Sequence, residues 1–394
     1  MITPTTGATR LPAAIWVLGF VSLLMDISSE MIHSLLPVFM VATLGMSALA
    51  VGLIEGAAEA TALIVKVFSG VLSDYWGRRK PLAVAGYALG ALSKPLFALA
   101  SGAGLLVTAR LLDRIGKGIR GAPRDALVAD LAPPGMRGAA FGLRQSLDTV
   151  GAFLGPLLAI VLMLLWANDV RAVFWVAVIP GVLAVLLLVI GIREPAVPTG
   201  APRSNPIQRE NLRRLDRHYW WVVAVGAVFT LARFSEAFLV LRAQQGGLPL
   251  AWTPMVLIVM SVVFSAGAYP FGKLSDRVSR RALLAGGLLA LVAADLLLAW
   301  RADGAVLWAG IALWGLHMAM TQGLLATLVA ESAPSDLRGT AFGFFNLMSG
   351  LALLVASGLA GLLWEVWGAP TAFMAGALFA LAAVGLLGLR PVTD

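Results

Sequence analysis

The chain of 394 residues contains no cysteine, three histidines and few charged residues. The absence of cysteine excludes disulfides, thiolate metal sites and cysteine nucleophiles. Charged residues make up 13% of the chain, whereas 59% is hydrophobic and the mean hydropathy is +0.88, so polar residues are too few to cover a soluble protein. The composition is therefore that of a membrane protein.

Motifs for nucleotides and metals are also lacking. No G-x-x-x-x-G-K-[ST] segment occurs, which argues against ATP as an energy source, and no H-E-x-x-H segment suggests a metal site. Residues 116–121 satisfy G-x-G-x-x-G, but they lie in an apolar run with no preceding strand. The net charge of +8 has no accompanying basic face for nucleic acid. We expect no enzyme activity, no metal, no nucleic-acid partner and no cofactor.

Long apolar runs dominate what is present. A membrane span needs about 20 largely apolar residues, and its backbone groups must pair within the segment, which favours helices. We therefore predict an all-α membrane protein with twelve transmembrane helices, in two six-helix bundles related by pseudo-two-fold symmetry. The predicted spans are 13–40, 47–72, 81–101, 103–128, 138–166, 171–192, 218–243, 252–275, 281–300, 305–330, 338–364 and 369–389.

The lysines and arginines predict the orientation. They gather in the connections after the even-numbered spans, for example at Arg78–Lys80, Arg137, Arg280 and Arg338, while the alternate connections carry almost none. Basic loops stay in the cytoplasm. We expect both termini to be cytoplasmic and the protein to lie in the inner (cytoplasmic) membrane.

The two halves repeat each other. Residues 70–80 correspond to 272–281, and residues 129–142 correspond to 330–343, at nearly one offset. Both copies run in the same direction, as expected for parallel repeats of six spans. We predict an N-terminal bundle at 1–192, a cytoplasmic linker at 193–217 and a C-terminal bundle at 218–394.

These motifs make the chain resemble the major facilitator superfamily. Residues 70–80 match its first signature, Arg110 stands at the span-4 arginine of its second, and residues 151–156 match its antiporter signature G-x-x-x-G-P. The resemblance implies two bundles that rock around a central cavity, a cytoplasmic charged latch and tight packing of span 5. The latch candidates are Gly70, Asp74, Gly77, Arg78, Arg79, Asp130, Asp276 and Arg280, and the packing candidates are Gly151, Gly155 and Pro156.

Ionisable residues inside the spans suggest where transport takes place. Asp26, Glu30 and His33 share one face of span 1, at i, i+4 and i+7, and Asp26 lies near the middle of the bilayer. Such groups are costly in lipid, so they face a cavity or pair with one another. The candidate proton-coupling residues are Asp26, Glu30, Glu55, Glu59 and Arg110. The candidate substrate-cavity residues are Arg114, Lys117, Arg233, Glu236, His317 and Gln322.

Several interpretations of these groups stay open. The acids of spans 1 and 2 and the bases of span 4 could form a purely structural ion-pair network. Arg233 and Glu236 could pair within one helix, His317 could simply be hydrogen-bonded, and Lys94 could snorkel or pair.

The expected function is proton-coupled antiport that exports a small amphipathic or toxic compound by alternating access. The proton gradient is the expected energy source, and the expected partners are the small-molecule substrate, protons and the lipid bilayer, with the protein as a monomer. Two alternatives are a proton symporter that imports a polar or anionic solute, and a transporter of metals or metal chelates. A sensor or a membrane-embedded enzyme would need an effector domain or a nucleophile and base, and we find neither.

Overall fold

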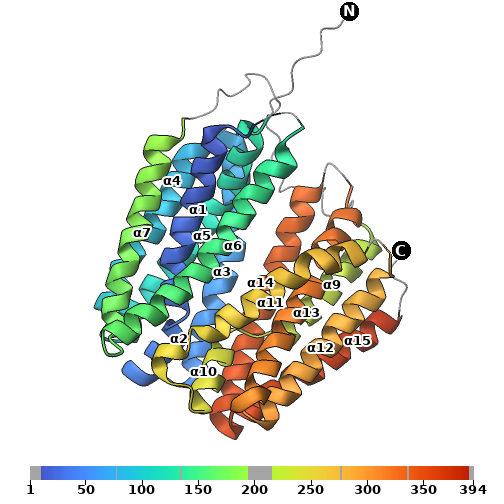
Figure 1. Ribbon diagram of the computed structural model, residues 1–394. Helices are drawn as coiled ribbons and strands as arrows, with labels where there is room; N and C mark the ends of the chain where they lie inside the picture. The colour runs from blue at the N-terminus through green and yellow to red at the C-terminus, as the bar shows by residue number, and fades with distance from the viewer. Residues whose placement is uncertain are drawn as a thin grey trace, which may run out of the picture.

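The computed structural model describes residues 10–76, 78–133, 135–193, 215–275, 277–334 and 337–389, and these residues form helices and loops without a strand. Figure 1 shows two helical bundles side by side, the first blue to green and the second yellow to red. Most of the predicted linker, along with Gly77 and Asp276, lies outside the described residues. The predicted boundaries of the two bundles stay a prediction.

The N-terminal bundle holds the first six predicted spans. The first span comprises one long helix and two short pieces because Pro37 cannot continue the hydrogen-bond ladder of a helix. The elements are α1 (Ala13–His33), α2 (Leu36–Val38), the π-helical turn η1 (Phe39–Thr43), α3 (Ala48–Trp76), α4 (Arg79–Leu99), α5 (Ala103–Leu131), α6 (Arg137–Leu165) and α7 (Val170–Gly191).

The C-terminal bundle holds the other six. Its elements are α9 (Arg217–Ala232), α10 (Ala237–Gln245), the 3-10 turn η2 (Leu250–Trp252), α11 (Met255–Leu274), α12 (Arg280–Trp300), α13 (Gly304–Glu331), α14 (Arg338–Trp367) and α15 (Ala369–Leu389). The same pairs of helices pack in each half: α1 on α6 and α3 on α5 correspond to α9 on α14 and α11 on α13. The packing therefore repeats as the sequence does.

The seventh predicted span is not one helix, which corrects the prediction of a continuous run at 218–243. The helix ends at Ala232 and resumes at Ala237. Phe234 is buried among Phe238, Trp314 and Phe373, with ring centroids 5.4–5.8 Å from its own. Burial of this ring holds the open turn, so Arg233 and Glu236 cannot pair across a helical i, i+3 spacing.

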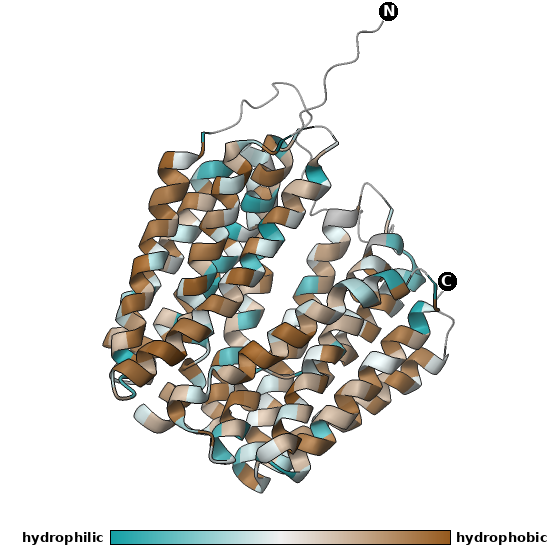
Figure 2. Ribbon diagram, in the orientation of Figure 1, coloured by the Kyte–Doolittle hydropathy of each residue, from teal (hydrophilic) through white to brown (hydrophobic). Residues whose placement is uncertain are grey.

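The outer surface is apolar, as a bilayer requires. Eleven of the described helical segments are long and apolar enough to cross a membrane. The helix missing from that set is α5, whose many charged residues lower its hydropathy. Figure 2 shows brown along most helices of both bundles, and Leu92, Leu165 and Ile190 are 69–80% exposed. An apolar outer surface that extends over both bundles is suited to contact with lipid.

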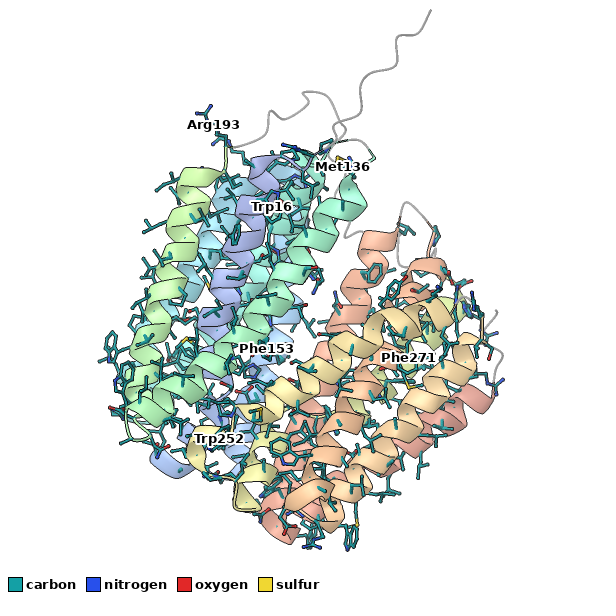
Figure 3. All side chains as sticks on the ribbon, in the orientation of Figure 1. Trp16, Met136, Phe153, Arg193, Trp252 and Phe271 are labelled. Atoms are coloured by element: carbon teal, nitrogen blue, oxygen red, sulfur yellow. The ribbon has the colours of Figure 1, made fainter. Side chains whose placement is uncertain are left out.

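The two halves meet at one end and along two pairs of helices, α3 with α14 and α6 with α11. Glycines bring α3 and α14 into backbone contact, because a Cβ on Gly52 would clash with the carbonyl oxygen of Ser357. One apolar cluster joins Leu36 and Val51 of the first half to Ala237 and Ala251 of the second. In Figures 1 and 3 this end, near α2, α10 and Trp252, lies opposite Arg193 and Met136.

Candidate transport site

A ladder of ion pairs joins α3 to α5. Glu55 and Glu59 lie one turn apart on α3, and Arg110 and Arg114 lie one turn apart on α5. Arg110 donates to Glu55 at 2.5 Å, and Arg114 donates to Glu59 at 2.9 Å. Matched i, i+4 spacing on two packed helices produces both contacts. The expected pairing of span-2 acids with span-4 bases is therefore present.

Asp113 extends this ladder into the interior. Its carboxylate forms ion pairs with Lys94 of α4 at 2.6 Å and with Arg114 at 2.9 Å. Lys94 also donates a hydrogen bond to the hydroxyl of Ser29 in α1. Lys94 and Asp113 are 1–2% exposed. Lys94 therefore pairs rather than snorkels. We did not place Asp113 among the candidate residues, although its position three residues after Arg110 could have indicated it.

The acids of α1 differ from one another. Glu30 lies 3.5 Å from the Nδ1 of His33, whose Nε2 is 3.7 Å from Glu55, so both belong to the ladder. Asp26 is half-buried and has no hydrogen-bond or ion-pair partner in the described part of the chain. Lys117 is exposed and likewise unpaired among those residues. Among the described residues, Asp26 is thus an acid within a membrane helix that no base neutralises by direct contact.

The antiporter signature packs against these acids. A Cβ on Gly151 would lie 3.0 Å from the Cβ of Asp26, and one on Gly155 would lie 2.8 Å from the Cβ of Glu30. The two glycines therefore allow the α6 backbone to touch the face of α1 that carries the carboxylates. Pro156 follows within the same helix and removes one backbone donor.

Charged residues near the start of α4 and the end of α5 form the region predicted as a latch. Arg79 contacts Asp130 at 2.8 Å, and in the second half Arg280 contacts Glu331. Asp130 thus pairs with Arg79, while Arg78 is exposed just before the start of α4. Gly70 lies where α3 passes α5, with the Cβ of Ala122 nearby. The side chain of Asp74 lies outside the described part.

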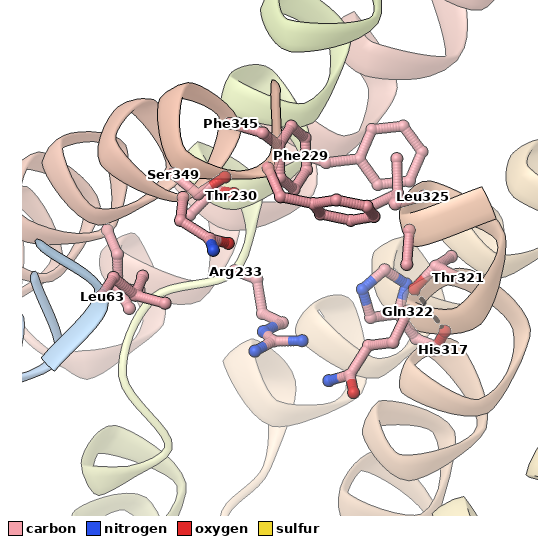
Figure 4. Close-up of a pocket in the computed structure, with 14 residues that line it drawn as sticks. Leu63, Phe229, Thr230, Arg233, His317, Thr321, Gln322, Leu325, Phe345 and Ser349 are labelled. Atoms are coloured by element: carbon pink, nitrogen blue, oxygen red, sulfur yellow. Dashed lines mark hydrogen bonds between the residues drawn. The ribbon is translucent and has the colours of Figure 1, made fainter. Parts of the chain in front are cut away.

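A cavity of about 380 Å³ opens in the C-terminal bundle. Three of the candidate substrate-cavity residues, Arg233, His317 and Gln322, line it, and Leu63 of α3 reaches it from the first half. Figure 4 shows Arg233 and Gln322 directed into the same space as the rings of Phe229 and Phe345. Glu236, Arg114 and Lys117, also predicted for the cavity, are not among its lining residues.

The sequence did not predict that Phe229 and Phe345 line the cavity. A phenylalanine in an apolar helix gives no signal in the sequence of what its ring faces. His317 is 2% exposed, and its Nδ1 lies 2.8 Å from the carbonyl of Gly287. His317 is therefore hydrogen-bonded, as one of the open interpretations held, and it also lines the cavity. Among the described residues, no group of three or more His, Asp or Glu side chains could hold a metal.

Two bundles of membrane-length helices, with a cavity in the second that a residue of the first also lines, have the architecture of a multi-pass membrane transporter. The sequence model of the Major Facilitator Superfamily matches residues 18–357 and 255–394. An uncharacterized MFS-type transporter of Methanocaldococcus jannaschii is 32% identical over 360 residues, which cover 89% of this chain and 88% of that protein. The chain belongs to the Major Facilitator Superfamily, as its motifs indicated.

Two further similarities extend this result. The multidrug resistance protein MdtH of Photorhabdus laumondii is 28% identical over 356 residues, with 89% of this chain and 86% of that protein covered. A crystal structure of a bacterial homologue of the human lysosomal transporter Spinster, inward-facing and unoccupied, superposes with a TM-score of 0.77. That alignment has 17% identity and covers 95% and 96% of the two chains, so it concerns the fold.

Proposed function

We propose that this transporter is a proton-coupled antiporter that exports a small amphipathic compound by alternating access. The observation that carries the proposal is Asp26, a half-buried carboxylate in the middle of a membrane helix with no direct partner among the described residues. An intramembrane acid without a fixed partner can bind and release a proton as its access to water changes. Glu30, Glu55, Glu59 and Arg110 then set the electrostatic environment of that step.

A packing contact and a similarity to a known protein support export. The glycines of the antiporter signature pack directly on the face that carries Asp26. The relative named as a multidrug resistance protein matches over most of both chains. In this proposal the proton gradient supplies the energy, no cofactor takes part, and a monomer is the working unit.

The proposal includes an orientation. With both termini in the cytoplasm of the inner membrane, the end sealed by Leu36, Val51 and Ala251 faces outwards. The structure then corresponds to an inward-facing state. Arg79 with Asp130, and Arg280 with Glu331, would contribute to the latch that closes the opposite end. Rocking of the halves about the α3–α14 contact would exchange the two states.

The direction of transport has one competing interpretation. Arg233 in the cavity favours negative charge on the cargo, which also suits a symporter that imports an anionic solute. The two functions differ in whether protons and cargo move in opposite directions or together. A single assay can distinguish them.

Purified protein in liposomes with an internal pH-sensitive dye tests the proposal. Under an imposed pH gradient, anionic, neutral and cationic amphiphiles are added, and antiport predicts proton movement opposite to that of the cargo. Asp26→Asn is expected to abolish the response to the gradient while gradient-free exchange persists. Asp303→Asn, at a 52% exposed side chain, is the matched control. A gradient response that survives in Asp26→Asn contradicts the proposal, and co-directional movement favours symport.

A further inference from the structure

The cavity of the C-terminal bundle has an unbalanced charge. Of the fourteen residues that line it, Arg233 is the single one with a permanent charge, and no carboxylate is among them. The other polar lining groups are amides, hydroxyls and the imidazole of His317. The wall therefore presents positive potential to whatever enters, and it offers no counter-charge to a cation.

The guanidinium of Arg233 also has no direct partner among the described residues. It follows the last residue of α9, and the buried ring of Phe234 holds the turn that directs it to the cavity. No hydrogen bond or ion pair within 4.0 Å engages its guanidinium in the described part of the chain, although the carboxylate of Glu236, three residues later, is close enough to interact with its charge at longer range. A guanidinium carries five donors in a planar fork that matches a carboxylate or sulfonate. An unpaired fork in a membrane-embedded cavity is thus a ready site for an anionic group.

The rest of the wall is built for an apolar body. Phe229, Phe342 and Phe345 line it from α9 and α14, together with Leu325. Gly226 makes room for this arrangement, because a Cβ there would lie 2.3 Å from the Phe345 ring. A volume of about 380 Å³ suits a molecule of one or two aromatic rings. Aromatic walls favour flat, apolar ligands through stacking and edge contacts.

Few polar groups remain to recognise anything else. Thr230 donates to the carbonyl of Gly226, and Thr321 donates to that of His317, so both hydroxyl protons are committed. Gln322, Asn346 and Ser349 have no partner in the described part of the chain and can fix one end of a ligand. A sugar or a peptide would need many more such groups.

We infer that the cargo is an organic monoanion with an aromatic, apolar body, whose anionic group binds Arg233 and whose body packs on Phe229, Phe342 and Phe345. This inference names the substrate class of the proposed transporter and rests on that function. It applies to export and to import alike, because it concerns the bound cargo and not the direction of movement.

Equilibrium binding of three matched probes tests the inference. Phenylbutyrate, phenylbutyramide and phenylbutylamine share one body and differ in charge. Their binding to the purified full chain is measured by calorimetry without any pH gradient. We expect the anion to bind about tenfold or more tightly than the neutral and cationic probes, because a charged hydrogen-bonded pair is worth more than 1.4 kcal/mol.

Variants identify the site. Arg233→Gln should abolish the preference for the anion, Arg233→Lys should retain part of it, and Phe345→Ala should weaken all three probes. Arg301→Gln, at a 55% exposed side chain, is the matched control for lost positive charge. A monodisperse Arg233→Gln protein in gel filtration shows that it remains folded.

Three outcomes would overturn the inference: equal binding of all probes, unchanged preference in folded Arg233→Gln, or no binding of phenylbutyrate at millimolar concentration. Failure of the proposed function is distinguished by the liposome assay. Selective binding without a proton response refutes the coupling and leaves the substrate class standing. A proton response to amines alone, unaffected by Arg233→Gln, refutes the substrate class and leaves the coupling standing.

Discussion

At the residue scale, the central fact is that most deep charges of the first half are paired, whereas Asp26, Lys117 and Arg120 have no ion-pair partner in the described part of the chain. Matching i, i+4 spacings in spans 2 and 4 made the contacts of Glu55 and Glu59 with Arg110 and Arg114 predictable. The role of Lys94 was not predictable, because its partner comes from a neighbouring helix whose rotation the sequence does not specify. Asp113, the ion-pair partner of Lys94, was for the same reason not predicted as a site residue.

Removing one partner of the Lys94–Asp113 pair should destabilise the protein more than removing both. Asp113→Asn leaves a buried ammonium without its counter-ion, at a cost of about 3–5 kcal/mol, whereas an apolar pair of similar volume is better tolerated. Thermal unfolding of the detergent-solubilised protein measures this. We expect the double variant Lys94→Met, Asp113→Leu to unfold at a higher temperature than Asp113→Asn. The reverse order would show that a hydrogen-bonding side chain at position 113, which Asn keeps and Leu lacks, matters more to the fold than removal of the unpaired ammonium.

Asp295 is a second buried carboxylate that the sequence did not single out. It is fully buried on α12, one oxygen accepts from the indole N–H of Trp314 at 2.9 Å, and the other has no partner among the described residues. Trp314 in turn packs on Phe234, at the break that positions Arg233. This contact makes Asp295 part of the support for the cavity.

Asp295→Asn should preserve the fold, because an amide oxygen can accept the same indole hydrogen. Asp295→Leu leaves that N–H unsatisfied and should cost about 1–3 kcal/mol. Melting temperatures of the two variants provide the comparison. If the asparagine variant is as unstable as the leucine variant, the acidic form itself is required and the hydrogen-bond account is wrong.

At the element scale, the apolar runs predicted the helices well, and the two broken spans show why prediction stops there. Pro37 gives a visible reason for the break after α1. The gap between α9 and α10 contains no proline or glycine; tertiary burial of Phe234 and the hydrogen bond from Ser235 to Ser357 hold it open. Such breaks depend on contacts between helices, which helix periodicity does not encode.

The contact of α6 with α1 gives a test at this scale. Gly155→Ala places a methyl carbon 2.8–3.1 Å from three atoms of α1, two of them backbone atoms, so the helices must move apart. We expect a lower melting temperature and impaired transport. Gly142→Ala on the same helix meets nothing within 4 Å and should be neutral or stabilising by up to about 1 kcal/mol. Equal melting temperatures for the two variants would exclude a packing role for the signature.

At the scale of the whole molecule, the repeat predicted two similar bundles but not how they meet. Their contact depends on glycines of α3 and α14 and on an apolar cluster assembled from both halves. One polar contact crosses at the same end: the backbone N–H of Leu49, in the first turn of α3, donates to Glu365 of α14 at 3.1 Å. A carboxylate at a helix N-terminus contributes about 0.3–1 kcal/mol.

That cap should favour closure of the end at which it lies. The chain has no cysteine, so a single introduced one reports accessibility without background. In the variant Ala251→Cys, the new thiol lies in the cluster between the halves, at a position now 4% exposed. Adding Glu365→Ala should raise its labelling by N-ethylmaleimide about two- to fivefold, the population shift that 0.3–1 kcal/mol produces.

Ala83→Cys is the control, because Ala83 is buried within the first bundle alone. Its labelling should not change when Glu365 is replaced, since the opening separates the halves without unfolding either. Parallel increases at both thiols would indicate general loosening of the fold. No increase at position 251 would mean that the apolar cluster closes this end without help from the cap. A selective increase would instead make Glu365 a residue of one half that sets the conformational balance through the first turn of a helix in the other.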